Sequence, residues 1–206
     1  STPEAIAAIL DQAPAPHDRN RPAPPASDTR ESSTSPNGFE RFDADVVTSA
    51  WGGVWFLVHA FLALDVVDSL GAGPVAAREV PDALTAIVVA VTGAPADDPS
   101  VSGLCGRGAA PAAWAPTPEQ EQDVERWAAA IGAWLGELAD GRLAARLVEP
   151  WAGSLWRRTV TIDMSLGRID ITSPLADVDI DIRISGLDID PGFVWWLGAV
   201  VGFRYV

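Results

Sequence analysis

Apolar and polar residues alternate along the last third of the chain, as they do in strands that bury one face. The run TVTIDMSL places four apolar residues on one face: Val160, Ile162, Met164 and Leu166. RIDIT repeats the alternation after Gly167, which predicts a hairpin. In DVDIDIRI the same alternation predicts two faces. The apolar side chains (Val178, Ile180, Ile182 and Ile184) would point inward, and the charged side chains (Asp177, Asp179, Asp181 and Arg183) would point toward water. Residues 151–206 are therefore predicted to form an antiparallel β-meander with one wet face, packed on helices.

Residues 39–150 show the longer period of helices instead. In TPEQEQDVERWAAAIGAWLGELADG, Thr117 and Gln120 form a predicted capping box, and Gly141 ends the helix. An earlier helix is predicted between Pro81, in its first turn, and Gly93, at its end. We therefore expect a helical middle region before the sheet.

The first 38 residues have the composition of a tether. Pro3 to Leu10 could form two helical turns, and Asp11 to Gly38 is rich in Pro, Ser and charge with almost no aliphatic residues. We expect residues 1–38 to be an N-terminal peptide and linker without a core of its own. The predicted fold class is α+β, with a disordered Pro-rich N-terminal tether, a helical middle and a C-terminal antiparallel sheet.

The segment 46–64 carries no formal charge over 19 residues, so by length it could span a membrane. Acidic residues bracket it on both sides, and the pair Gly52 and Gly53 weakens a continuous helix. A buried helix from about Gly53 to Leu64 fits better, with His59 as a core histidine whose ring nitrogens are satisfied. A membrane-associated protein that uses 46–64 to link a particle or partner to a bilayer is the alternative.

Composition narrows the classes of function. The net charge of −14 opposes nucleic acid and anionic lipid, and all 14 basic residues are arginine. A single cysteine, Cys105, excludes an internal disulfide, and two histidines leave little material for a transition-metal site or a catalytic triad. No secretory signal is visible at the start of the chain, so we expect a cytoplasmic location.

The alternating aspartates and the pair Asp188 and Asp190 raise the question of a metal or acid–base site. Aspartates on one strand face lie roughly 7 Å apart, too far to share an ion without a neighbouring strand. No other catalytic group is identifiable near Asp188 and Asp190. The alternation is better explained as a solvated outer face that discourages edge pairing. We predict no catalytic, cofactor-binding or metal-ligating residues and no cofactor.

Three stretches carry a family resemblance. Asp177 to Tyr205, with its Gly-Leu-Asp-Ile-Asp-Pro-Gly turn, Trp-Leu-Gly and closing Phe-Arg-Tyr, resembles the C-terminal signature of proteins from contractile injection system clusters. WGGVWFLVHAF, from Trp51, and GAPADDPSVSGL, from Gly93, are similar to blocks in the tape-measure-associated chains of those clusters. The chain lacks the long repeated region expected of a ruler. The resemblance implies a non-enzymatic structural or assembly component of a phage-tail-like particle, either tape-measure-related or a terminal or accessory subunit.

The last apolar segment supplies the interface candidates. In strand geometry Phe193 and Trp195 share a face and Trp196 points the other way, so one aromatic should stay exposed. Large exposed aromatics are typical anchors of protein–protein contacts. We predict that Trp196 or its neighbour contacts another subunit, with Asp188 and Asp190 beside it. The expected partners are other particle subunits or a second copy, not nucleic acid, within or beside an assembled particle in the cytoplasm.

Overall fold

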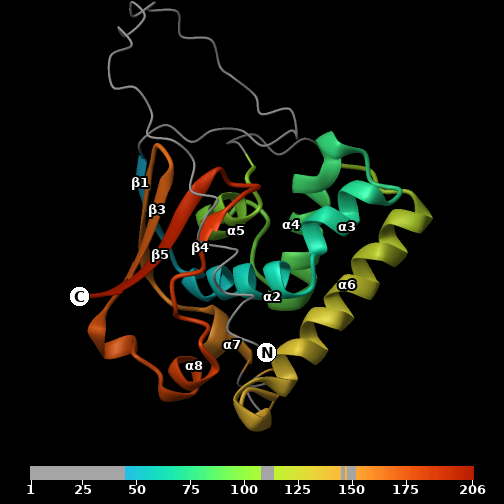
Figure 1. Ribbon diagram of the computed structural model, residues 1–206. Helices are drawn as coiled ribbons and strands as arrows, with labels where there is room; N and C mark the ends of the chain where they lie inside the picture. The colour runs from blue at the N-terminus through green and yellow to red at the C-terminus, as the bar shows by residue number, and fades with distance from the viewer. Residues whose placement is uncertain (1–44, 108–113, 145–146, 148–151) are drawn as a thin grey trace, which may run out of the picture. The chain divides into compact units, whose positions relative to one another are not determined.

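The structure is a computed structural model that describes residues 45–107, 114–144, 147 and 152–206. The expected peptide and linker of residues 1–38 lie outside the described residues. The helices are α2 (Leu57–Ala63), α3 (Val66–Ala72), α4 (Val80–Thr92), α5 (Pro99–Leu104), α6 (Pro118–Glu137), α7 (Ala152–Trp156) and α8 (Ile180–Ser185). Short 3-10 helices are η1 (Gly52–Phe56), η2 (Ala77–Glu79), η3 (Leu138–Gly141) and η5 (Leu175–Asp177). The strands are β1 (Asp45–Ser49), β2 (Val160–Ser165), β3 (Arg168–Ser173), β4 (Gly192–Val194) and β5 (Ala199–Tyr205). This confirms the α+β class (Figure 1).

The five strands form one mixed sheet in the order β1-β2-β3-β5-β4. The predicted hairpin of β2 and β3 is present, with Ile162 opposite Ile171. The purely antiparallel meander was wrong in one pairing, because β3 and β5 run parallel, with Ile169 beside Val201. The chain leaves β3 through η5 and α8, forms the edge strand β4, and returns as β5 between its neighbours. A crossover of that kind is what parallel pairing requires.

Alternation in the hairpin strands holds as predicted. Val160, Ile162 and Met164 of β2 are buried while Thr161, Asp163 and Ser165 are exposed. Leu166 is exposed because it lies in the turn before Gly167, beyond the last residue of β2. The inward side chains join the helices in a single core, where Gly103 of α5 lies close to both Trp55 of η1 and Met164 of β2.

The predicted strand DVDIDIRI is wrong. Residues Ile180–Ser185 form the helix α8, in which Ile182 is buried and Ile180 and Ile184 face solvent. Asp179 caps this helix, since its Oδ1 accepts the backbone N–H groups of Asp181 (3.0 Å) and Ile182 (3.5 Å). Gly186 ends it in the left-handed conformation (φ 76°).

The surroundings of Asp179 explain why helix wins over strand here. Its Oδ2 accepts a hydrogen bond from the guanidinium of Arg158 at 3.1 Å, and Arg158 also donates to the carbonyl of Asp177 at 2.7 Å. These contacts hold the helix N-terminus against the segment before β2. The cap and the ion pair both stabilise the helical conformation of this segment. They outweigh the preference for a strand that alternating aliphatic residues give, because β-propensity depends strongly on context.

The helix α6 begins and is capped as predicted. Thr117 and Gln120 form the capping box, with Gln120 Oε1 accepting the Thr117 N–H at 2.9 Å. Ile131 and Leu135 of α6 are buried, and α6 packs against α4, whose C-cap Gly93 is left-handed. Among the described residues of 39–150 the regular elements are helices, apart from β1, whose five residues join the edge of the sheet beside β2.

The apolar segment 46–64 is divided between β1, η1 and α2, and most of its residues from Gly52 on are in the core. Gly52 and Gly53 allow the close approach that this requires. The Gly52 N–H donates to the Arg158 carbonyl (2.8 Å), and a Cβ on Gly53 would collide with the Leu155 carbonyl. Within the described residues no one helix combines the length and apolar composition that crossing a membrane requires. Gly52–Ala63 and Val66–Ala72 meet the length and composition requirements only when they are taken together, and the chain bends by 63° between them.

Candidate interaction surface

Exposed large apolar side chains are concentrated near the C-terminal end of the described chain. Among the described residues, eleven large apolar side chains are exposed, and ten of them lie at or after Leu166. They are Leu166, Leu175, Val178, Ile180, Ile184, Ile189, Phe193, Trp195, Val200 and Val206. Scattered exposed aliphatics are normal on protein surfaces, whereas two exposed aromatics within three residues are not. The candidate surface is therefore the one that holds Phe193 and Trp195.

Phe193 lies in the edge strand β4, and Trp195 lies in the turn just after it. Phe193 is 64% exposed and Trp195 39%, while the intervening Val194 is buried. Phe193 pairs across β4 and β5 with Val200, which is also exposed. The ring of Trp195 meets the ring of Trp196 edge-on with centroids 5.9 Å apart. That contact fixes the orientation of the half-exposed indole, because edge-to-face pairs are favourable.

Trp196 belongs to the core and is withdrawn as an interface candidate. It is 3% exposed, its Nε1 donates to the Leu104 carbonyl at 3.1 Å, and its ring lies 6.2 Å from that of Phe61. The helices α2 and α5 supply these partners from the far side of the segment. A buried indole with a satisfied N–H has no surface to offer a partner, so the neighbour Trp195 is the candidate that remains.

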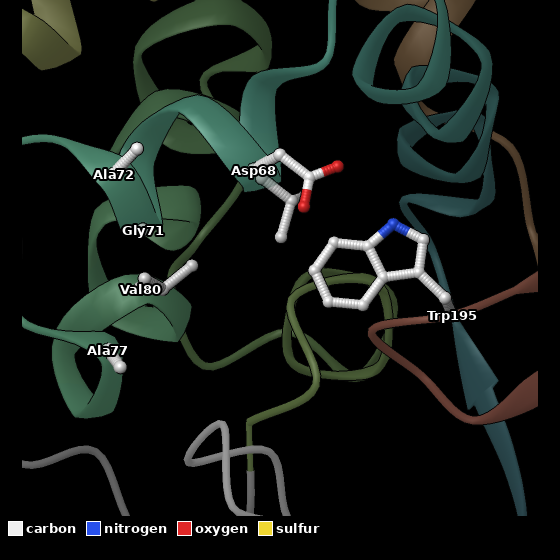
Figure 2. A pocket seen from close by; sticks show the side chains of 7 residues that line it. Asp68, Gly71, Ala72, Ala77, Val80 and Trp195 are labelled. Atoms are coloured by element: carbon white, nitrogen blue, oxygen red, sulfur yellow. The ribbon is translucent and has the colours of Figure 1, made fainter.

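Trp195 also forms one wall of a pocket of about 380 Å³ (Figure 2). The other lining residues come from α3 and from the segment around η2: Val67, Asp68, Gly71, Ala72, Ala77 and Val80. Figure 2 shows the carboxylate of Asp68 beside the indole of Trp195, whose ring is seen face-on. Among the described residues that line this pocket, Asp68 carries the only charge. The pocket is thus lined by several apolar side chains together with polar surface, and Asp68 is the one charged side chain among its described lining residues.

Asp188 lies inside the fold, and its partners are side chains of the C-terminal region. Its side chain is fully buried, and Oδ2 accepts from the Tyr205 hydroxyl (3.1 Å) and pairs with Arg183 (3.4 Å). Oδ1 has no hydrogen-bond partner within the described residues. Burial, followed by the nearby carboxylate, raises the pKa of Tyr205 to about 12. As an interface candidate Asp188 is therefore withdrawn.

His59 of α2 lies near this buried carboxylate. Its ring stacks on Phe203 with centroids 6.2 Å apart. Burial lowers the pKa of His59, while hydrogen bonding to the backbone of Ile189 and Leu187 and the charge of Asp188 oppose that shift. Nε2 is buried without a partner among the described residues, so the expectation of a fully satisfied core histidine was wrong for that nitrogen.

Asp190 is exposed and serves the turn before β4. Its Oδ1 accepts the backbone N–H of Phe203 at 2.7 Å. Asp188 and Asp190 thus have different partners: one carboxylate is buried against Tyr205, and the other binds the backbone of β5. Each carboxylate thus binds a different group of the last strand, β5. This arrangement does not support an acid–base pair.

Metal and thiol chemistry find little support within the described residues. No group of three or more His, Cys, Asp or Glu side chains there could hold a metal ion. Asp179 serves as a helix cap and salt-bridge partner. Cys105 is completely buried, and burial raises the pKa of its thiol to about 12, which suppresses the reactive thiolate.

The pocket beside Trp195 was not foreseen from the sequence. Asp68 and Trp195 are far apart in the chain, and no local pattern links a short helix to an edge strand. The faint signal was composition: Gly71 and Ala72 are too small to fill the space beside the indole. A scan against protein-family models finds no match to this chain, and searches of curated proteins and of solved structures find none either.

Proposed function

We propose that the protein is a non-enzymatic structural or assembly component of a contractile injection system, bound to other particle subunits through Phe193 and Trp195. The observation that carries the proposal is the exposure of these two aromatics, one in the edge strand β4 and the other in the turn just after it. Both lie within the stretch Asp177 to Tyr205, on which the resemblance to such particles rests.

Three other prominent residues of that stretch have internal roles, whereas Phe193 and Trp195 are the large aromatics exposed there. Asp188 binds Tyr205, Asp190 binds the backbone of β5, and Trp196 enters the core. Phe193 contributes little to the core, since most of its surface is exposed. A large aromatic that folding does not require is the kind of residue that interfaces use as an anchor.

The packing of 46–64 favours this role over a bilayer link. Trp55, Leu57 and Phe61 of that segment are among the most completely buried side chains of the described residues. Moving them into lipid would expose the inner face of the sheet and leave a large cavity in the core. A subunit role requires no such rearrangement.

The test is co-purification from the native cell. Tagged protein should sediment in a high-mass fraction together with tube and sheath subunits. The double variant Phe193→Ala/Trp195→Ala should leave that fraction while keeping the far-ultraviolet circular dichroism of the parent protein. Leu166→Ala is the matched control, because Leu166 is also exposed but lies in the β2–β3 turn.

Two outcomes would contradict the proposal. One is the recovery of intact particles that contain none of the protein, and the other is a double variant that stays in the particle fraction at the parent level. Substrate turnover by the purified protein that survives loss of particle association would instead favour an enzyme.

A further inference from the structure

The pocket between Trp195 and Asp68 has a composition that suits one class of ligand. Its apolar lining residues include Val67 of α3, Val80 at the start of α4, and Trp195. Its volume of about 380 Å³ falls within the range of about 300–1,000 Å³ that is usual for ligand sites. Asp68 forms no ion pair within the described residues, so its charge is available at the pocket edge.

We propose that this pocket takes a lysine or arginine side chain from a partner protein. The aliphatic stem of such a side chain would pack on Val67 and Val80, as long cationic side chains do on apolar surfaces. The cationic head would then lie between the indole face and the Asp68 carboxylate. An indole attracts a cation through its ring electrons, and a carboxylate attracts it through charge. Gly71 contributes the room, since a Cβ built there meets no atom within 4 Å.

The net charge of the chain indicates which kind of molecule would supply the cation. The chain carries a net charge of −14, so two copies repel each other and a partner with basic surface is attracted. The inference rests on the proposed function, because it names the chemistry by which a particle subunit would engage Trp195. A second copy offering one of its arginines is an outcome that the experiment separates.

The experiment uses small mimics of the two side chains and the full chain. Butylammonium represents lysine, propylguanidinium represents arginine, and butan-1-ol is the neutral control of similar shape. Binding is followed by the NMR shifts of the Val67 and Val80 methyl groups and of the Trp195 indole N–H. We expect both cations to cause saturable shifts at these groups, with the alcohol binding more weakly.

Variants identify which groups hold the cation. Asp68→Asn should weaken cation binding about two- to fivefold, the size expected of an exposed ion pair. Trp195→Leu should weaken it by a similar factor, because the cation–π contact is lost. Gly71→Leu should abolish binding by filling the pocket. Asp65→Asn is the matched control, since it removes one charge just before α3 at a residue outside the pocket lining and should change nothing.

The inference is overturned if butan-1-ol binds as tightly as the cations, or if folded Asp68→Asn binds them as well as the parent protein. Self-association in light scattering that Asp68→Asn abolishes would place a second copy in the pocket and also overturn it. The proposed function fails separately. A protein that binds the cations but never enters particles refutes only the particle role. Particles that retain Asp68→Asn at the parent level refute only the pocket.

Discussion

Asp179 offers the sharpest test of the C-terminal architecture, because helix and strand assign it opposite roles. On a solvated strand face, Asp179→Asn would cost well under about 1 kcal/mol. In the structure Asp179 caps α8 and pairs with Arg158, and the side chains are only 19% and 9% exposed respectively. Replacing it should therefore be costly, and two substitutions divide that cost between cap and charge.

Asp179→Asn keeps a good capping side chain but removes the charge. An exposed ion pair contributes about 0.2–1 kcal/mol, whereas breaking a fully buried one costs about 3–5 kcal/mol. This pair lies between those limits, and Arg158 keeps the Asp177 carbonyl as an acceptor at 2.7 Å. We expect a loss of about 2 kcal/mol in the free energy of unfolding. Asp179→Ala also removes the cap, which adds about 1 kcal/mol.

Urea denaturation followed by circular dichroism and by tryptophan fluorescence measures these differences. A double-mutant cycle of Asp179→Asn with Arg158→Met should give a coupling free energy of about 1–2 kcal/mol. Ile182→Ala, at the buried position of α8, should cost about 2–5 kcal/mol and serves as the core reference. A loss below about 0.5 kcal/mol for Asp179→Asn, with no coupling to Arg158, would refute the capped helix and restore the solvated strand.

Two further predictions concern the close approach at η1 and the titration of buried groups. Gly53→Ala should destabilise the protein by several kcal/mol or prevent folding, because the added Cβ would collide with the Leu155 carbonyl. Gly132→Ala in α6 should instead raise the melting temperature, because a Cβ there meets no atom within 4 Å and alanine has the higher helix propensity. Equal melting temperatures for the two variants would contradict this packing. Tyr205, the single tyrosine, should ionise near pH 12 by its absorbance at 295 nm, and Cys105 should resist alkylation until the chain unfolds. Both pKa values are higher in the folded state than in the unfolded state. The contribution of these two groups to the free energy of unfolding is therefore complete below about pH 8 and is lost as the pH rises toward 12. A tyrosine absorbance midpoint near pH 10 in the folded protein would contradict this.

Local patterns predicted those parts of the fold whose partners are close in sequence. The β2–β3 hairpin needs only its alternation and Gly167, and the start of α6 needs only the capping box of Thr117 and Gln120. An exposed aromatic in the last apolar segment was likewise expected from strand geometry. Each of these features is determined within a few residues, so tertiary contacts do not override it.

Distant partners explain the failures. Trp196 is drawn inward by the Leu104 carbonyl, 92 residues away, and α8 is fixed by Arg158, 21 residues before its cap. In the sequence, β1 is part of one long apolar run. Its strand conformation depends on pairing with β2, which is distant in the chain. For the candidate site, the aromatic pair was predictable, but the pocket was not, since it depends on how α3 lies against the segment after β4.

The position of β5 in the sheet has a consequence for synthesis. It is the last described strand to leave the ribosome, yet it lies between β3 and β4 and pairs with both. Until residues 199–205 emerge, β3 presents an unpaired edge and the inner face of the sheet lacks Val201. Domains fold as units and exposed strand edges favour aggregation, so the nascent chain is most vulnerable just before its final strand appears. Slow translation over the last codons of this region would therefore lower the yield of folded protein, whereas slow translation through α6 would not.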